Sequence, residues 1–252
     1  MTYQPIEDYG VIGDLRTAAL IGKNGSIDWL CFPRFDSPSV FGAILDDKKG
    51  GYFRICPEDV KVTIKQIYWP DTYILVTRFL SADGVAELID FMPVRSGHHN
   101  TLSGSVIRKV RVVRGTMRFC LECQPAFNYA RDKHTTRIVH GNAYFRAGEL
   151  HLCLKSSVRL RHSGTGVSAT FSLSEGKGRS FELYGVDDHG QSAGNALSEG
   201  DSERLFNETV AFWRGWVSKG TYRGRWREMV YRSALVLKLL TYEPTEIGRA
   251  HV

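Results

Sequence analysis

Polar and apolar residues alternate with a period of two along roughly the first 190 residues of this chain. Clear examples are residues 60–65, 106–113 and 151–154. Such alternation is typical of strands that bury one face and expose the other, whereas helical patterns repeat every three or four residues. Glycine-containing turns, such as Asn24-Gly25, separate the strands. Many short strands at hairpin spacing predict a mainly β fold built as a large antiparallel β-sandwich.

The period changes near residue 200, after a segment at 187–200 that is rich in Gly, Ser and Asp and is predicted to be a linker. Apolar residues then recur at helical steps in two stretches, and the first helix is expected to be capped by Asp201 or Ser202. The first stretch carries Leu205, Phe206, Val210, Trp213, Trp216 and Val217, and the second carries Trp226, Met229, Val230, Ala234, Leu237 and Leu240. Full burial of a large apolar side chain is worth about 1.5–3 kcal/mol, so both helices need a partner surface.

Composition narrows the class of protein. Apolar residues make up 42% of the 252, which is enough for a sizeable core and argues against disorder. No apolar run is long enough for a membrane span, and the first residues lack a secretory leader, so we expect a cytoplasmic protein without a membrane partner. The odd count of five cysteines favours reduced thiols.

Two local patterns invite a binding hypothesis. Basic residues cluster between Arg108 and Arg118, which is compatible with phosphate binding, but no nucleic-acid motif accompanies them and a solvated strand face is the simpler interpretation. Cys120 and Cys123 have the spacing of half a zinc site, yet residues three apart on a strand point to opposite faces, and no second ligand pair follows. We therefore expect neither a nucleic-acid partner nor a metal.

The stretch from Ile27 to Ser39 is the candidate site. Asn24-Gly25 favours a two-residue turn, and Pro33 should end the strand that follows it, because proline cannot donate to a sheet. Groups at such a strand end are well placed to bind ligands, and Arg34 offers several donors for hydroxyls or carboxylates, while Trp29 and Phe35 offer aromatic faces. Aromatic rings suit the apolar faces of sugars. The alternative is that Trp29 and Phe35 lie in the core while Arg34 and Asp36 form a local ion pair.

Three blocks of sequence resemble the bacterial family 15 glycoside hydrolases, the glucoamylase and trehalase-like group. They are IEDYGVIGDLRTAALIGKNGSIDWLCFPRFDSPSVFGAILD at 6–46, QPAFNYAR at 124–131, and FWRGWVSKGTYRGRWREMVYRSALVLKLLTYEPT at 212–245. The second block is similar to a Phe-Asp-Tyr-Gly-Arg motif of the family, from which Asn128 and Ala130 depart. The resemblance covers about residues 5–245 and stops there.

This resemblance implies a β-sandwich at 1–195 and, at 196–245, a linker helix and the first helix of an (α/α)6 barrel, with 246–252 as a non-native tail of a truncated chain. Family members hydrolyse α-glucosidic bonds with inversion, using two glutamates that lie beyond residue 245 and neither metal nor organic cofactor. The resemblance thus implies an α-glucoside substrate in a longer protein, with no catalytic residue in this chain and no activity of its own. It also makes Trp29, Arg34 and Asp36 the candidate substrate-binding residues, as part of the wall of the sugar pocket near the interface between sandwich and barrel. It leaves the particular α-glucoside and the oligomeric state open.

Two other functions stay open on the sequence alone. One is a free-standing carbohydrate-binding β-sandwich, which saturable sugar binding by this chain would favour. The other is a basic structural or nucleic-acid-binding module, which salt-dependent binding to DNA would reveal.

Overall fold

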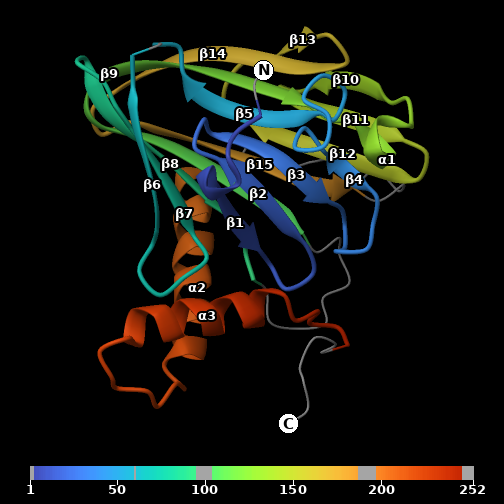
Figure 1. The fold of residues 1–252 in the computed structure, drawn as a ribbon. Helices are drawn as coiled ribbons and strands as arrows, with labels where there is room; N and C mark the ends of the chain where they lie inside the picture. Colours follow the sequence, from blue (N-terminus) through green and yellow to red (C-terminus); the bar gives the residue numbers. More distant parts are fainter. Residues whose placement is uncertain (1–2, 60, 95–103, 187–196, 246–252) are drawn as a thin grey trace.

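The computed structural model describes residues 3–59, 61–94, 104–186 and 197–245 (Figure 1). Within these ranges the chain forms one continuous network of 15 strands, in which every paired strand runs antiparallel to its neighbour. The strands are β1 (Tyr9–Gly13), β2 (Ala18–Gly22), β3 (Ser26–Cys31), β4 (Ser39–Phe41), β5 (Tyr52–Pro57), β6 (Thr63–Tyr68), β7 (Leu75–Leu80), β8 (Gly84–Phe91), β9 (Ser105–Gln124), β10 (Thr135–Val139), β11 (Asn142–Ala147), β12 (Leu150–Ser156), β13 (Arg161–Ser163), β14 (Gly166–Ser174) and β15 (Gly178–Val186). The helical elements are a 3₁₀ turn (Ile6–Asp8), α1 (Phe127–Ala130), α2 (Glu199–Val217) and α3 (Arg227–Leu239).

The long strand β9 belongs to both layers of the sandwich. Its first half pairs with β8 and β15, whereas its second half pairs with β5 and β14. The change of partners falls at Gly115, whose φ of 76° lies in the left-handed region that glycine adopts readily. A Cβ at this position would lie 2.0 Å from the carbonyl oxygen of Asp83, so the crossing point needs glycine. One layer thus contains β1–β5, β13 and β14, and the other contains β6–β8, β10–β12 and β15.

The main core lies between the layers, and the period-two pattern predicted its positions. Val106, Val110 and Val112 of β9 all point inward and are buried, which confirms the strand at 106–113. Arg108 shares their face and is also fully buried, so the interpretation of the basic cluster as a solvated strand face is wrong for this residue. The interpretation holds for Arg118, whose side chain is 62% exposed.

The two C-terminal helices pack against the sandwich in different places, α2 along the second layer and α3 beneath the sheets (Figure 1). Helix α2 lies on the outer face of the second layer, where Leu205 and Phe206 pack against apolar side chains of β7, β8 and β9. Helix α3 crosses below the sheets and turns Tyr231, Leu235 and Leu239 toward them. The predicted cap is wrong, because α2 begins three residues earlier, where the Ser198 hydroxyl accepts a hydrogen bond from the Asp201 backbone N–H.

Candidate functional site

The β2–β3 hairpin has the tight turn that Asn24-Gly25 predicts. Gly25 has a φ of 76°, and a Cβ there would lie 2.2 Å from the Ile55 carbonyl oxygen, so only glycine fits. The Gly25 carbonyl accepts hydrogen bonds from the backbone N–H of Ile55 at 3.0 Å and from Nη2 of Arg108 at 2.7 Å. These contacts fix the start of β3 and hence the direction in which it carries its side chains.

Arg108, which binds the Gly25 carbonyl of this hairpin, also forms a buried ion pair with Asp90 that the sequence did not reveal. Its Nε and Nη2 donate to the two Asp90 carboxylate oxygens at 2.8 and 3.2 Å, and Nη1 donates to the Phe53 carbonyl. Its guanidinium also lies 4.8 Å from the centre of the Phe53 ring. Burial raises the pKa of Asp90, and the positive charge of Arg108 opposes that shift.

Trp29 is half-buried, and its ring lies close to an aromatic ring from another segment of the chain. Its ring centre lies 6.3 Å from that of Tyr129 in α1, with 44° between the ring planes. Cys31 lies two residues further along β3. Burial is the largest cause that raises the pKa of its thiol, while Tyr129 opposes this shift and the Asp36 charge adds to it.

Arg34 and Asp36 protrude from the loop between β3 and β4. Arg34 Nε lies 3.2 Å from Asp36 Oδ1, and the two side chains are 58% and 77% exposed. The local ion pair that the sequence left as an alternative is therefore present, although both groups remain open to a ligand. Phe35 turns the other way and packs edge-on against Tyr242 at 6.5 Å between ring centres.

The same corner is tied to the segment after α3. Arg16 Nη2 lies 3.0 Å from Glu243 Oε2, and the Glu243 backbone N–H donates to the Leu15 carbonyl. Asp14 holds this loop by accepting hydrogen bonds from the backbone N–H groups of Arg16 and Thr17. Burial raises the pKa of Asp14 to about 6 despite these hydrogen bonds, because desolvation of the charged form outweighs them.

A second polar cluster, also missed by the sequence, lies beside Trp29. The buried carboxylate of Asp28 accepts hydrogen bonds from the Tyr9 hydroxyl at 2.8 Å and from the Ser26 hydroxyl at 2.5 Å. Burial is the largest cause that raises the pKa of Tyr9, and the contact with Asp28 raises it further. With both of its oxygens engaged, Asp28 is held in place as a structural acceptor.

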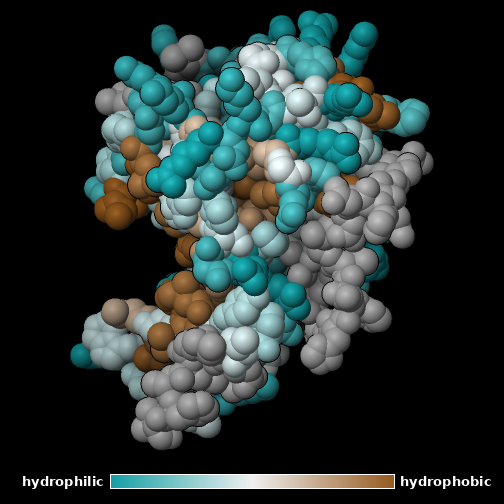
Figure 2. All heavy atoms as spheres, turned by 90° about the vertical axis from the view of Figure 1, so that its right-hand side faces the viewer, coloured by the Kyte–Doolittle hydropathy of each residue, from teal (hydrophilic) through white to brown (hydrophobic). Residues whose placement is uncertain are grey.

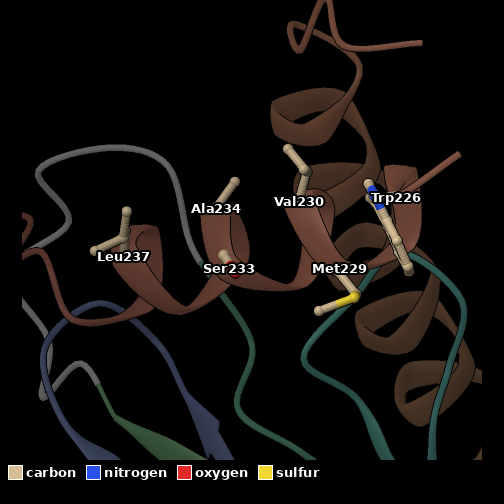
Figure 3. Close-up of a pocket in the computed structure, with 6 residues that line it drawn as sticks. All are labelled: Trp226, Met229, Val230, Ser233, Ala234 and Leu237. Atoms are coloured by element: carbon tan, nitrogen blue, oxygen red, sulfur yellow. The ribbon is translucent and has the colours of Figure 1, made fainter. Parts of the chain in front are cut away.

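Helix α3 presents a second apolar stripe away from the sandwich. The residues of this stripe line an open groove with a volume of about 640 Å³. They are Trp226, Met229, Val230, Ser233, Ala234 and Leu237. In Figure 3, the side chains of Val230, Ala234 and Leu237 point away from the strands. Figure 2 shows hydrophobic side chains on this helical part of the surface. Leu237 is 69% exposed and Met229 64%, which is unusual for residues of this kind on a helix.

The described ranges contain no cluster of three or more His, Cys, Asp and Glu side chains that could hold a metal ion. In the same part of the chain, none of the helices has the length and apolar character needed to cross a membrane. The Cys120 and Cys123 side chains lie on opposite faces of β9, as their spacing predicted, with Cys123 in the core.

Comparison with known proteins places these features in a family. The sequence model of the family described as "Trehalase-like, N-terminal" matches residues 2–156. A trehalase of Thermoplasma volcanium is 34% identical over 96% of this chain and 38% of its own length. A trehalase of Thermoplasma acidophilum is 35% identical over 90% of this chain and 38% of its own length. A trehalase of Mycolicibacterium smegmatis is 34% identical over 96% of this chain and 39% of its own length. The chain thus spans about two fifths of the length of these relatives.

Proposed function

Because this chain belongs to the family of trehalase-like N-terminal domains, we propose that it is the amino-terminal part of an inverting α-glucoside hydrolase of the trehalase or glucoamylase type. The observation that carries the proposal is the extent of the match. Proteins named trehalase align with 96% of this chain, including both C-terminal helices, while the aligned part is only 38–39% of their own length.

We propose that residues 1–195 belong to the β-sandwich and 196–245 to the linker helix and the first helix of an (α/α)6 barrel. The linker predicted at 187–200 lies partly outside the described residues, and the tail predicted at 246–252 lies wholly outside them. The shape of α3 supports this division. One of its faces packs on the sandwich through Tyr231, Leu235 and Leu239, and the opposite face forms the open apolar groove. A helix that is apolar on two sides is suited to burial between two layers. Further helices of a barrel are the layer that we propose for the second side.

Inverting hydrolysis needs one carboxylic acid and one carboxylate about 6.5–9.5 Å apart, with room for a water molecule between the base and the sugar. Buried carboxylates among the described residues already have partners within the chain. Asp90 is paired with Arg108, and Glu87 is paired with both Arg78 and Arg111. We therefore propose that both catalytic groups belong to the barrel and that this chain alone hydrolyses no glycosidic bond.

Within the longer enzyme, we propose that Trp29, Arg34 and Asp36 form part of the wall of the sugar site. Arg34 supplies several hydrogen-bond donors and Asp36 supplies acceptors, which together match the hydroxyl groups of a glucoside. The loop that carries them reaches the segment after α3 through the contact between Phe35 and Tyr242. This contact supports a position of the charged pair near the junction from which the proposed barrel extends.

A chimera tests the proposal. This chain, joined to the part of the Mycolicibacterium smegmatis trehalase that follows its matched segment, should release glucose from trehalose. The 252-residue chain alone should release no more glucose than a blank. A cooperatively folded chimera without activity, or hydrolysis by the chain alone, would contradict the proposal.

We also propose that the protein is cytoplasmic and acts on a sugar without metal or organic cofactor. The state of its cysteines supports the location. All five are free thiols, although Cys56 and Cys120 occupy directly opposed positions on neighbouring strands. Free thiols are usual in a reducing compartment. Fractionation of the source cells, followed by detection of the protein with an antibody, tests this location.

A further inference from the structure

The turn that carries Tyr129 has an uncommon backbone. Asn128, Tyr129 and Ala130 are three successive non-glycine residues with positive φ angles of 51°, 57° and 61°. Each such residue costs about 1–2 kcal/mol relative to the right-handed conformation, apart from the smaller penalty for Asn. A strained turn of this kind persists only where its surroundings hold it, and such turns cluster at functional sites.

The surroundings of this turn do hold it. The Ala126 backbone N–H donates to the Val40 carbonyl at 2.8 Å, which joins the entry of the turn to β4. The Asp132 backbone N–H donates to the Phe127 carbonyl at 3.2 Å, which closes the exit. The Phe127 side chain is 1% exposed and belongs to the main core. The core therefore fixes one end of the turn, while Tyr129 is presented at the surface.

Tyr129 and Trp29 form an open corner with polar groups at its edges. The Tyr129 side chain is 41% exposed, and its ring lies beside the half-buried ring of Trp29 at an angle of 44°. Arg131 lies 5.8 Å from the centre of the Tyr129 ring. In the same turn, the Asn128 side-chain amide donates a hydrogen bond to the Asp132 carboxylate at 3.2 Å. Two aromatic faces, with a guanidinium and a carboxylate on the segment that carries one of them, are suited to a neutral ring that carries hydroxyl groups.

We propose that Trp29 and Tyr129 together receive one pyranose ring of the glucoside, which makes Tyr129 a further substrate-binding residue. This inference rests on the proposed function and refines its sugar site. An aromatic side chain offers a large rigid surface with few rotatable bonds, so little conformational entropy is lost on contact. The core-anchored turn reduces that loss again, because the ring is already in position before the sugar arrives.

The test measures sugar binding by the 252-residue chain, with trehalose and maltose as probes, through saturation-transfer NMR. Tyr129→Ala should weaken binding by about tenfold, which corresponds to a loss of about 1.4 kcal/mol. Tyr129→Phe keeps the ring and should bind within about twofold of the parent. Tyr222→Ala is the matched control, because Tyr222 is similarly exposed at 39% but lies in the α2–α3 loop. Equal affinity of the Tyr129→Ala variant and the parent would overturn the inference.

A second measurement does not depend on a variant that folds. Hydroxyl-radical footprinting of the unmodified chain should show that trehalose protects Trp29 and Tyr129, while Trp226 and Tyr222 react at unchanged rates. Absence of protection at Trp29 and Tyr129, or absence of saturable binding of either sugar, would overturn the inference.

The two levels of the proposal fail in different ways. If Tyr129 is not a sugar contact, the chimera with the trehalase barrel still hydrolyses trehalose, and Tyr129→Ala leaves its Michaelis constant unchanged. If the proposed function is wrong, the unmodified chimera has no activity.

Discussion

We expect the stability of the sandwich to be most sensitive to substitution at Arg108, and the Arg108→Met variant tests this. The substitution keeps the approximate length of the side chain but removes the charge from a site where both Arg108 and Asp90 have exposures of 0%. It leaves the Asp90 carboxylate buried without its partner and removes donors from the Gly25 and Phe53 carbonyls. Loss of one member of a buried pair typically costs 3–5 kcal/mol, so we expect the free energy of unfolding to fall by about 4 kcal/mol. This is a large part of the 5–15 kcal/mol usual for a folded domain.

Urea denaturation followed by circular dichroism measures this loss, and a double-mutant cycle identifies its cause. Asp90→Leu combined with Arg108→Met removes both charges and should recover at least about 2 kcal/mol relative to Arg108→Met alone, because no unpaired charge remains. The matched control is Arg118→Met on the same strand, whose exposed ion pair with Glu58 is worth at most about 1 kcal/mol. A loss below about 1 kcal/mol for Arg108→Met would refute the reasoning.

Three further predictions concern strain and titration. Ala130→Gly should raise the free energy of unfolding by about 0.5–1 kcal/mol, since glycine relieves the left-handed strain at φ 61°. Ala169→Gly, within strand β14, is the control and should lower the free energy of unfolding. A urea midpoint that is higher for Ala169→Gly than for Ala130→Gly would contradict the account. The raised pKa of Asp14, about 6, means that the folded chain binds this proton more tightly than the unfolded chain, so the free energy of unfolding should fall by about 2 kcal/mol as pH rises from 4 to 6. Asp14→Asn should remove that part of the slope in unfolding experiments across this range, and an unchanged slope would exclude Asp14 as its source. Burial and the neighbouring Cys56 and Glu58 raise the pKa of Cys120 to about 11, so its alkylation by iodoacetamide, followed by mass spectrometry, should accelerate about tenfold per pH unit from pH 7 to 10, without a plateau near pH 8.5.

Much of the fold could be predicted from the sequence because the alternation of residue types reflects the geometry of a pleated sheet. The pattern at 106–113 placed Val106, Arg108 and Val110 on one side, and the structure confirms that all three point inward. The charge of Arg108 suggested solvent instead. The period was the better guide, because the partner that makes burial tolerable, Asp90, lies 18 residues away along the chain and opposite it on β8.

The candidate site was predictable only in part. Asn24-Gly25 and Pro33 located the corner that carries Trp29, because turn preference and the missing proline donor are local properties. Tyr129 could not be placed there from these rules, since its neighbour across space is set by the tertiary fold. One local feature pointed to an unusual turn next to Tyr129. Ala130 stands where the similar Phe-Asp-Tyr-Gly-Arg motif has glycine, and it adopts a left-handed φ.

The Michaelis constant for trehalose of the chimeric enzyme tests most directly whether the sandwich corner belongs to the sugar site. Arg34→Ala should raise this constant or lower the turnover number, while the melting temperature stays unchanged because the ion pair with Asp36 is exposed. Kinetics and melting that both match those of the unmodified chimera would remove Arg34 from the site and contradict the account.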